Sequence, residues 1–374
     1  MTSRTLIVRQ AHSAQPDAEA AVAELARELD SANASMILFF CSPRYNLKSL
    51  GDALRRTFSS PVSGCTSAGQ IDRSGYRAQG GITAVSLTSS ALRATPFLIS
   101  QLQETAEVID VGYRAVGELV RRSSSGAFGL LLIDGLSCAE ERVAAALHQS
   151  LGDVPLIGGS AADELEFRQT HVYHDGEFLS RAATFVLFDT SLPFAAFSLQ
   201  SAVPTSDKLV VTSAEPRQRR VLEINGKRAV KAYAEKLGAD PARLTAADCA
   251  RRPLLLQAGG EHYVRGVRAV NSDGSLSLWC AIEEGAVLSL GAETSGLDAL
   301  EREFAAVERR IGPPALVIGM DCVTRRLQHE ARAEAAAVGD LLSRHRVVGF
   351  CTYGEQFDSL HLSQTFTGMA LGGG

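Results

Sequence analysis

The chain has 374 residues, of which 45% are hydrophobic and 21% charged, a composition typical of a folded protein large enough for two domains. Its formal net charge is −5, and the densest basic stretches, Arg217–Arg220 and Arg325 with Arg326, are too short for a nucleic-acid groove. No apolar run approaches the roughly 18 residues of a membrane span, and the first residues lack the apolar core of a secretory signal. We therefore expect a cytoplasmic protein with no nucleic-acid or membrane partner.

The seven cysteines are widely spaced, and none forms a C-x-x-C pair. This spacing excludes a zinc knuckle, and the odd number does not suggest a disulfide framework. The absence of C-x-x-C-H also excludes the usual covalent attachment of haem. We expect most of the cysteines to be small buried hydrophobes in a reducing compartment.

A strand-helix-strand unit that ends in a glycine turn occurs first in the N-terminal part, after a short strand at Thr5–Ala11 and a helix that starts at Pro16. The unit consists of a strand at Met36–Ser42, a helix over about Leu47–Arg56, and the turn PVSGCTSAG at Pro61–Gly69. This is the length of a crossover connection between parallel strands.

The same unit recurs after a helix at Glu104–Arg122. Its first strand is Phe128–Gly135, and Ser137 starts the joining helix with acidic residues in the first turn, where the helix dipole favours them. The turn VPLIGGSAAD at Val154–Asp163 completes it. The stretch Val203–Lys208 contains Pro, Ser and Asp and predicts a boundary between two domains, residues 1–203 and 204–374.

The C-terminal half contains a third copy of the unit. Before it, the pair Asn225-Gly226 predicts a turn between a strand and the helix Arg228–Leu237. The third copy consists of the strand Ala315–Cys322, a helix over Arg325–Leu342 and the stretch VVGFCTYGEQ at Val347–Gln356, and the tail after it predicts one last strand. The predicted fold is therefore α/β, with two domains and mixed sheets built from three repeated strand-helix-strand-glycine-turn units.

The three glycine turns are the first places to look for a site, because ligands of mostly parallel sheets bind at strand ends. Their amides can hold a carboxylate or phosphate, or the glycines can merely allow close packing, and both readings remain open. None of the turns matches a P-loop or a dinucleotide-binding fingerprint, and no local signature links a nucleophile to a base. We therefore predict that the chain is not an enzyme.

His361 differs from the other histidines because Leu360 and Leu362 flank it and Phe366 and Met369 follow it. It comes shortly after the third glycine turn and can face the same end of the sheet. A histidine in such an apolar frame is either a satisfied core residue or a ligand.

Several longer motifs resemble those of FIST-domain sensory proteins. DC-x-x-R at Asp321–Arg325, GF-x-TYGEQ at Gly349–Gln356 and H-x-x-QT-x-TG at His361–Gly368 resemble the C-terminal half of that family, and SGCTSAG, DGLSCAEE, IGGSAAD and VYHDG resemble its N-terminal half. The likeness extends from about Leu6 to Leu371. It implies a FIST N-terminal domain in residues 1–203 and a FIST C-terminal domain in residues 204–374.

The histidine-containing tail and the GFCTYGEQ stretch are most similar to the NosP-type subgroup of this family. That resemblance implies an intracellular sensor that binds b-type haem non-covalently, senses nitric oxide and regulates a partner histidine kinase or cyclic-di-GMP enzyme. His361 would be the axial ligand of the haem iron, in a site formed by His361, Phe350, Tyr353, Phe366, Met369 and Arg325. Relatives usually carry Asn two places after this histidine, where the present chain has Ser363.

Two alternatives remain open at this point. In the first, the chain is a haem-free sensor in which the glycine turns and Arg325 hold the carboxylate of an amino acid. In the second, it is a ligand-free scaffold for a signalling partner. A homodimer is compatible with either alternative.

Overall fold

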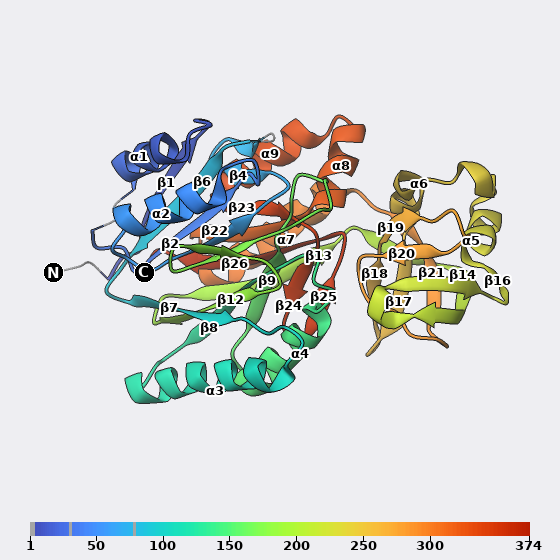
Figure 1. Cartoon of the computed structure of the whole chain (residues 1–374), viewed down its shortest axis with the longest axis horizontal. Helices are drawn as coiled ribbons and strands as arrows, with labels where there is room; N and C mark the ends of the chain where they lie inside the picture. Colours follow the sequence, from blue (N-terminus) through green and yellow to red (C-terminus); the bar gives the residue numbers. More distant parts are fainter. Residues whose placement is uncertain (1–3, 30–31, 78–79) are drawn as a thin grey trace.

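Three mixed sheets form the main body of the protein (Figure 1). The structure, a computed structural model, describes residues 4–29, 32–77 and 80–374. In the order of their strands, the first sheet contains β1 (Ile7–Ser13), β6 (Ile82–Thr88), β2 (Met36–Cys41), β3 (Val62–Thr66), β10 (Val172–His174) and β11 (Glu177–Leu179). The second contains β25 (Leu360–Leu362), β24 (Glu355–Phe357), β9 (Leu156–Ser160), β8 (Ala127–Ile133), β12 (Ala183–Thr190) and β7 (Leu92–Ile99). The third contains β13 (Phe194–Gln200), β26 (Thr365–Gly372), β22 (Pro314–Cys322), β23 (Val347–Thr352), β4 (Gln70–Asp72) and β5 (Gly75–Arg77).

Each of these sheets contains one of the predicted repeats. The strand pairs β2–β3, β8–β9 and β22–β23 are parallel. They are connected by α2 (Leu47–Thr57), by α4 (Glu140–Leu151), and by α8 (Val323–Ala331) followed by α9 (Ala335–Arg344). The predicted α/β fold with three strand-helix-strand units is therefore confirmed.

The hairpin that follows each repeat joins the sheet of a different repeat. Hairpin β4–β5 follows β3 but pairs with β23, hairpin β10–β11 follows β9 but pairs with β3, and hairpin β24–β25 follows β23 but pairs with β9. Every repeat thus supplies a sheet edge to another repeat. Because of this exchange, the three repeats form one body and not three separate domains.

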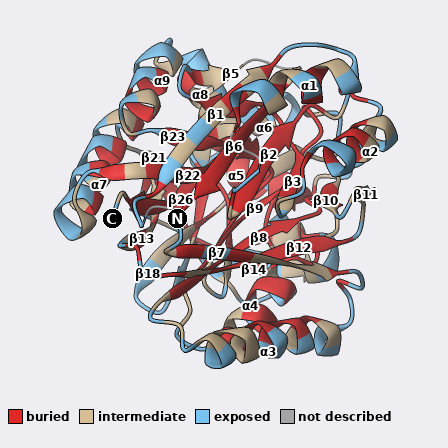
Figure 2. Ribbon diagram, turned by 90° about the vertical axis from the view of Figure 1, so that its left-hand side faces the viewer, coloured by how far each residue is buried: buried red, intermediate tan, exposed pale blue. Residues whose placement is uncertain are grey.

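The inner faces of the three sheets share one apolar core, and pairs of helices cover their outer faces (Figure 2). The ring of Phe350 on β23 stacks on that of Phe40 on β2, with centroids 4.5 Å apart. Full burial of such a side chain contributes about 1.5–3 kcal/mol. The outer helices are α1 (Ala18–Glu28) with α2, α3 (Thr105–Arg122) with α4, and α7 (Gly296–Ile311) with α9.

Residues 202–293 form a separate lobe, which extends from one end of the body in Figure 1. Its strands are antiparallel in the order β18 (Glu261–Arg265), β17 (Leu254–Ala258), β21 (Val287–Glu293), β14 (Ala202–Glu215), β15 (Arg220–Ile224), β20 (Leu276–Leu278) and β19 (Val267–Val270), with β16 (Lys227–Arg228) beside β15. The lobe also contains α5 (Ala229–Leu237) and α6 (Ala246–Arg251), and the predicted turn at Asn225-Gly226 lies between β15 and β16. The predicted domain boundary after residue 203 falls at the start of the lobe, whereas residues 294–374 return to the body.

The predicted last strand is in fact two strands in different sheets. Gln364 has φ of 55°, a left-handed conformation that breaks the extended tail between β25 and β26. Strand β25 joins the second sheet beside β24, and β26 lies in the third sheet between β13 and β22. His361 and Phe366 are therefore directed to different parts of the body.

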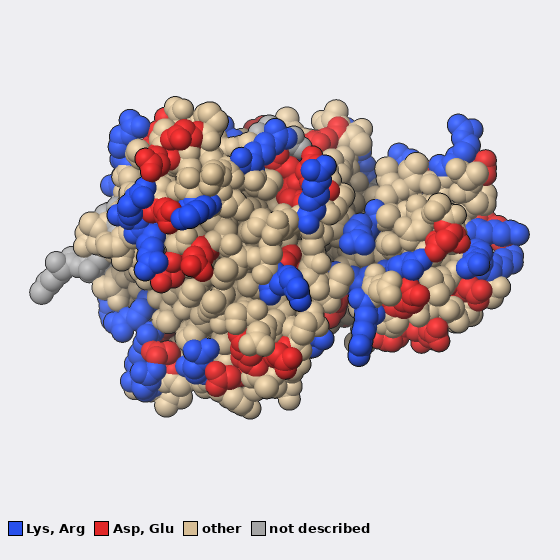
Figure 3. All heavy atoms as spheres, viewed as in Figure 1, with Lys and Arg blue, Asp and Glu red and all other residues tan. Residues whose placement is uncertain are grey.

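Among the described residues, no helix combines the length and the apolar character needed to cross a lipid bilayer. On the face shown in Figure 3, basic and acidic side chains are interspersed over both the body and the lobe, and a narrow waist separates the two.

Candidate functional site

The three glycine turns meet one another at the ends of the parallel strands. The amide of Ala68 donates to the carbonyl of Cys351 at 3.0 Å, that of Ala162 to Thr66 at 3.0 Å, and that of Ser160 to Gly354 at 2.8 Å. These amides are therefore satisfied by the backbone of the neighbouring turn. The structure favours the packing role of the turns over a role in ligand binding.

The six residues predicted to hold haem are distributed among several parts of the molecule. Phe350 and Met369 lie in the central core, whereas Phe366 packs beneath α7. Tyr353 contacts Trp279 of the lobe, with ring centroids 5.3 Å apart. Arg325 is buried in an ion pair with Asp321, whose Oδ1 lies 2.8 Å from Nε of Arg325. They line no common slot, because β23, β24, β25 and β26 belong to two different sheets.

The residues around His361 indicate whether it could serve as an axial haem ligand. Its side chain is fully buried, Nδ1 lies 3.1 Å from Nε2 of Gln356, and Nε2 faces Oε1 of Glu140 at 4.0 Å. A Cβ atom on Gly354 would lie only 2.4 Å from its Cε1. A haem site needs an apolar slot open at one face of the imidazole. The residues around His361 are polar and close-packed, so they do not fit a haem.

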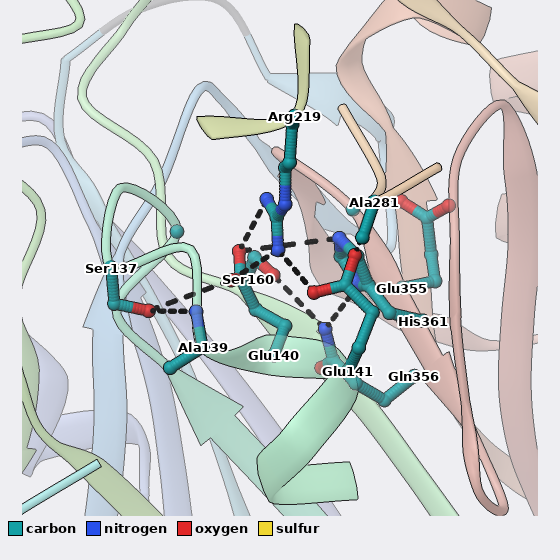
Figure 4. Close-up of polar contacts among 12 residues, drawn as sticks. Ser137, Ala139, Glu140, Glu141, Ser160, Arg219, Ala281, Glu355, Gln356 and His361 are labelled. Atoms are coloured by element: carbon teal, nitrogen blue, oxygen red, sulfur yellow. Dashed lines mark hydrogen bonds and ion pairs between the residues drawn. The ribbon is translucent and has the colours of Figure 1, made fainter. Parts of the chain in front are cut away.

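Charged side chains from the body and the lobe meet at the start of α4 (Figure 4). The guanidinium of Arg219 places Nη2 2.6 Å from a carboxylate oxygen of Glu140 and 2.6 Å from one of Glu141. Arg219 follows the short 3-10 turn Pro216–Gln218 and has φ of 54°, which directs it out of the lobe sheet toward α4. Oε1 of Glu141 also accepts a hydrogen bond from the amide of Ala281, at 2.7 Å.

The pKa values of this cluster reflect its mixed charges. Burial opposes the charged form of His361, but Cys280, Glu141 and Glu140 outweigh it and raise the pKa of the imidazole to about 9. Burial likewise opposes ionisation of Glu141, but His361 and Arg219 lower the pKa of that carboxyl to about 2. The cluster therefore keeps an electrostatic contact between the body and the lobe at neutral pH.

A cleft of about 400 Å³ separates the lobe from the body, and we call it the interlobe cleft. The body contributes the loop after β9 and one face of α8, and the lobe contributes α6, β19 and Trp279. Phe167 and Leu327 are large apolar side chains that remain 44% and 43% exposed at its edge. The described lining residues are Leu165, Phe167, Ala246, Ala247, Ala250, Arg251, Val267, Arg268, Trp279, Val323, Thr324, Leu327, Gln328, Ala331 and Arg332.

A small cavity of about 10 Å³, which we call the hinge cavity, lies next to this cleft and shares Gln328 and Arg332 with it. Ser201 and Thr294, which also line it, belong to the two segments that connect the body to the lobe. Three buried nitrogen atoms of its lining residues have no hydrogen-bond partner in the part of the chain that the structure describes: Nη2 of Arg325, Nε2 of His329 and Nε2 of Gln364. Nη2 of Arg325 and Nε2 of Gln364 are donors, whereas in His329 the donor role falls to Nδ1, which faces Oε2 of Glu334 at 3.3 Å. An unpaired buried donor costs about 1–3 kcal/mol, so these two favour an acceptor at this position.

Sequence reasoning missed several residues of these sites. Arg219 belongs to the basic stretch Arg217–Arg220, for which the sequence predicted no site, and it is only 4% exposed. Cys280 was expected to be merely a small buried hydrophobe. His329, which the sequence analysis did not single out, is 3% exposed. Arg325 was the exception, because the haem-free alternative proposed it as a carboxylate ligand. The DGLSCAEE motif, which contains both glutamates, was the available signal for the cluster at α4.

Comparison with protein families gives two matches. The family model described as FIST N domain matches residues 35–227, and the one described as FIST C domain matches residues 229–358. A search of curated proteins gives no match to this chain.

Comparison with solved structures gives several matches, among them two cyanuric acid hydrolases. One is 11% identical with a TM-score of 0.35, over 98% of this chain and 100% of that chain. The other, from A. caulinodans, is 11% identical with a TM-score of 0.34, over 98% of this chain and 99% of that chain. Both are enzymes, a finding that contradicts the prediction of no enzymatic activity, and we withdraw that prediction. A likeness this remote assigns no reaction to the present chain.

Proposed function

Because this chain belongs to the FIST family, we propose that it is a signal-transduction sensor that binds a small apolar carboxylate between its body and its lobe. Family membership implies a sensor of small ligands. The class of ligand and the position of the site are our inference from the geometry.

The main support for this proposal is the pair of unpartnered donors, on Arg325 and Gln364, among the residues that line the hinge cavity. Arg325, His329 and Gln364 are 2%, 3% and 5% exposed, and each has a nitrogen without a partner among the residues around the same cavity. A volume of about 10 Å³ admits one oxygen-sized group. One oxygen of a carboxylate would accept hydrogen bonds from Arg325 and Gln364, and the bond from the guanidinium would be charge-assisted.

The lining of the interlobe cleft indicates the chemistry of the rest of the ligand. It is mostly apolar, and Val267, Trp279 and Leu327 supply surface for a hydrocarbon or aromatic group. Its described lining includes three arginines and no acidic side chain. A carboxylate without an ammonium group, such as an aryl or branched aliphatic acid, therefore suits it better than an amino acid.

The position of the cavity suggests how binding is transmitted. The amide of Thr294 donates to the carbonyl of Ser201 at 2.8 Å, so the two connecting segments are held together beside the cavity. A ligand that contacts both segments and both walls of the cleft binds best to one orientation of the lobe and shifts the population toward it. In this proposal, a histidine kinase or a cyclic-di-GMP enzyme detects that orientation.

Thermal denaturation tests the proposal with pairs of probes. We expect phenylacetate or 4-methylpentanoate at millimolar concentration to raise the Tm of the chain, and the matching neutral amides to leave it unchanged. A ligand at 100 times its Kd stabilises the folded state by about 2.7 kcal/mol. Equal shifts with acids and amides, or no shift with any acid of a broad apolar series, would show that the site is not a carboxylate site.

Two variants locate the site. Gly296→Ala adds a methyl group 2.9 Å from Cε1 of His329 and reduces the hinge cavity, and Ala331→Trp fills the cleft from an exposed position on α8. Both should abolish the acid-dependent shift. The matched control is Ala23→Trp, an exposed alanine of α1, which should retain it.

A further inference from the structure

The geometry points to a second site, in which Glu141, Cys280 and His361 bind a divalent transition-metal ion such as Zn²⁺. The three residues come from α4 in the body, from the lobe and from β25. One ligand atom of each, a carboxylate oxygen, Sγ and an imidazole nitrogen, lies within 4.8 Å of the other two. This inference rests on different residues from those of the carboxylate site and does not depend on it.

A second observation at the same place indicates a missing ligand. Within the described part of the chain, no nitrogen or oxygen atom forms a hydrogen bond with Nε2 of His361, although the side chain is fully buried, and the Cys280 thiol lies beside the imidazole. Its separation of 4.0 Å from Oε1 of Glu140 is too long for a hydrogen bond. An ion coordinated by this nitrogen would remove the cost of leaving it unpaired.

Gln356 is placed to orient the imidazole for this role. Its amide nitrogen lies 3.1 Å from Nδ1 of His361 and 3.0 Å from Oγ of Ser160 (Figure 4), and its Oε1 has no partner among the residues that the structure describes. With the amide turned by 180°, Oε1 would accept hydrogen bonds from Nδ1 and from the Ser160 hydroxyl. Nε2 would then be free for the ion, in the arrangement by which metal-bound histidines are usually held.

The donor set selects the kind of ion. Thiolate and imidazole ligands suit zinc and its neighbours, whereas Mg²⁺ and Ca²⁺ prefer oxygen ligands. Three protein ligands leave the fourth position of a tetrahedron for water. The Glu141 side chain is 32% exposed and provides a path for entry.

Such an ion would join the lobe to two elements of the body. Glu141 lies in the first turn of α4, His361 lies in the β24–β25 hairpin, and Cys280 follows β20 of the lobe. The Arg219 ion pairs already connect the lobe with α4, and the metal would add the hairpin to the same junction. Occupancy should therefore stabilise the lobe in its present orientation.

Cobalt titration of the chain, after treatment with a chelator, tests this assignment. Co²⁺ should bind in a one-to-one ratio, give a thiolate-to-cobalt charge-transfer band and intense visible bands of four-coordinate cobalt, and be displaced by Zn²⁺. Cys280→Ser should lose the charge-transfer band. Gln356→Ala should weaken binding by about 10-fold or more, because the imidazole loses its orienting partner.

The matched control is Cys138→Ser, because Cys138 is the half-buried thiol and the most open to adventitious cobalt. Its spectrum should equal that of the wild-type chain. Absence of stoichiometric cobalt binding by the wild-type chain would overturn the inference without any variant. A charge-transfer band that survives in Cys280→Ser would also overturn it.

Discussion

Gly354 shows how one residue determines the geometry of the hairpin that carries His361. It lies between β23 and β24, where the chain passes from the third sheet to the second. A Cβ atom at this position would lie 2.4 Å from Cε1 and 2.9 Å from Nε2 of His361. The third glycine turn therefore needs glycine because the buried imidazole approaches its backbone closely.

We expect Gly354→Ala to lower the free energy of unfolding by about 1–3 kcal/mol, the usual cost of forcing extra volume into a packed interior. Chemical denaturation measures it. Gly117→Ala is the control, since nothing lies within 4 Å of the added methyl group and α3 gains a better helix former. An equal change in the free energy of unfolding for the two substitutions would show that His361 leaves room for a methyl group at position 354.

Glu355 is a fully buried carboxyl in the same hairpin. Burial is the main influence and raises its pKa to about 7 from the ordinary 4.5, although Thr352 and Thr365 donate hydrogen bonds to it. Between these two pH values the folded chain retains a proton that the unfolded chain has lost. The contribution of this group therefore stabilises the fold below about pH 4.5 and is lost as the pH rises through 7.

This difference predicts that Glu355 alone makes the chain about 2–3 kcal/mol less stable at pH 8 than at pH 5. In Glu355→Gln this part of the pH dependence should disappear, whatever the absolute stability of the variant. Urea denaturation at both pH values gives the comparison, and Glu177→Gln, at an exposed position, should behave as the wild-type chain does. An unchanged slope in Glu355→Gln would contradict the assignment.

At the scale of elements, the start of α4 connects the body with the lobe. Arg219, which is 4% exposed, reaches both acidic residues of the first turn of this helix. Removing one member of a buried ion pair leaves uncompensated charge and costs about 3–5 kcal/mol. The β14–β15 turn and α4 should therefore lose stability together.

We expect Arg219→Leu to destabilise the chain by about 3 kcal/mol or more, and Glu140→Gln added to it to recover part of the loss. Denaturation of the single and double variants measures the coupling. Arg220→Leu is a neighbouring control, because its ion pairs with Glu215 and Asp273 are partly exposed and contribute at most about 1 kcal/mol each. An equal decrease in the free energy of unfolding for the two arginine variants would mean that the ion pairs of Arg219 stabilise the fold no more than those of Arg220.

At the scale of the whole molecule, the exchange of hairpins keeps the predicted haem residues apart. Phe350 and Met369 lie inside the core shared by the three sheets, whereas His361 faces the lobe junction. A macrocycle that contacted all of them would have to separate sheets that exchange hairpins. The cost would be a large part of the stability of a folded domain, which is about 5–15 kcal/mol.

We therefore expect hemin added to the purified chain to give no saturable Soret band that depends on His361. An absorbance titration of the wild-type chain and of His361→Ala provides the measurement. A saturable band that is lost in His361→Ala would contradict this expectation and would mean that the hairpin opens to admit haem.

Much of the architecture was determined by the sequence alone. The three repeats were predictable because their apolar strands, the helices between them and their glycine turns are local patterns of periodicity and backbone conformation. The Asn225-Gly226 turn and the acidic start of α4 were also predictable, because both depend on residues adjacent in the chain.

The tertiary structure decided which residues share a site. Arg219 is one of several basic residues in its stretch, and only the approach of the β14–β15 turn to α4 buries it against two carboxylates. Arg325, His329 and Gln364 come together around one cavity only where the two segments that join the body to the lobe meet. The left-handed Gln364 sends His361 and Phe366 into different sheets, so the haem site implied by the tail motif was not assembled. Burial and desolvation act between segments far apart in the chain, so local sequence patterns do not reveal them.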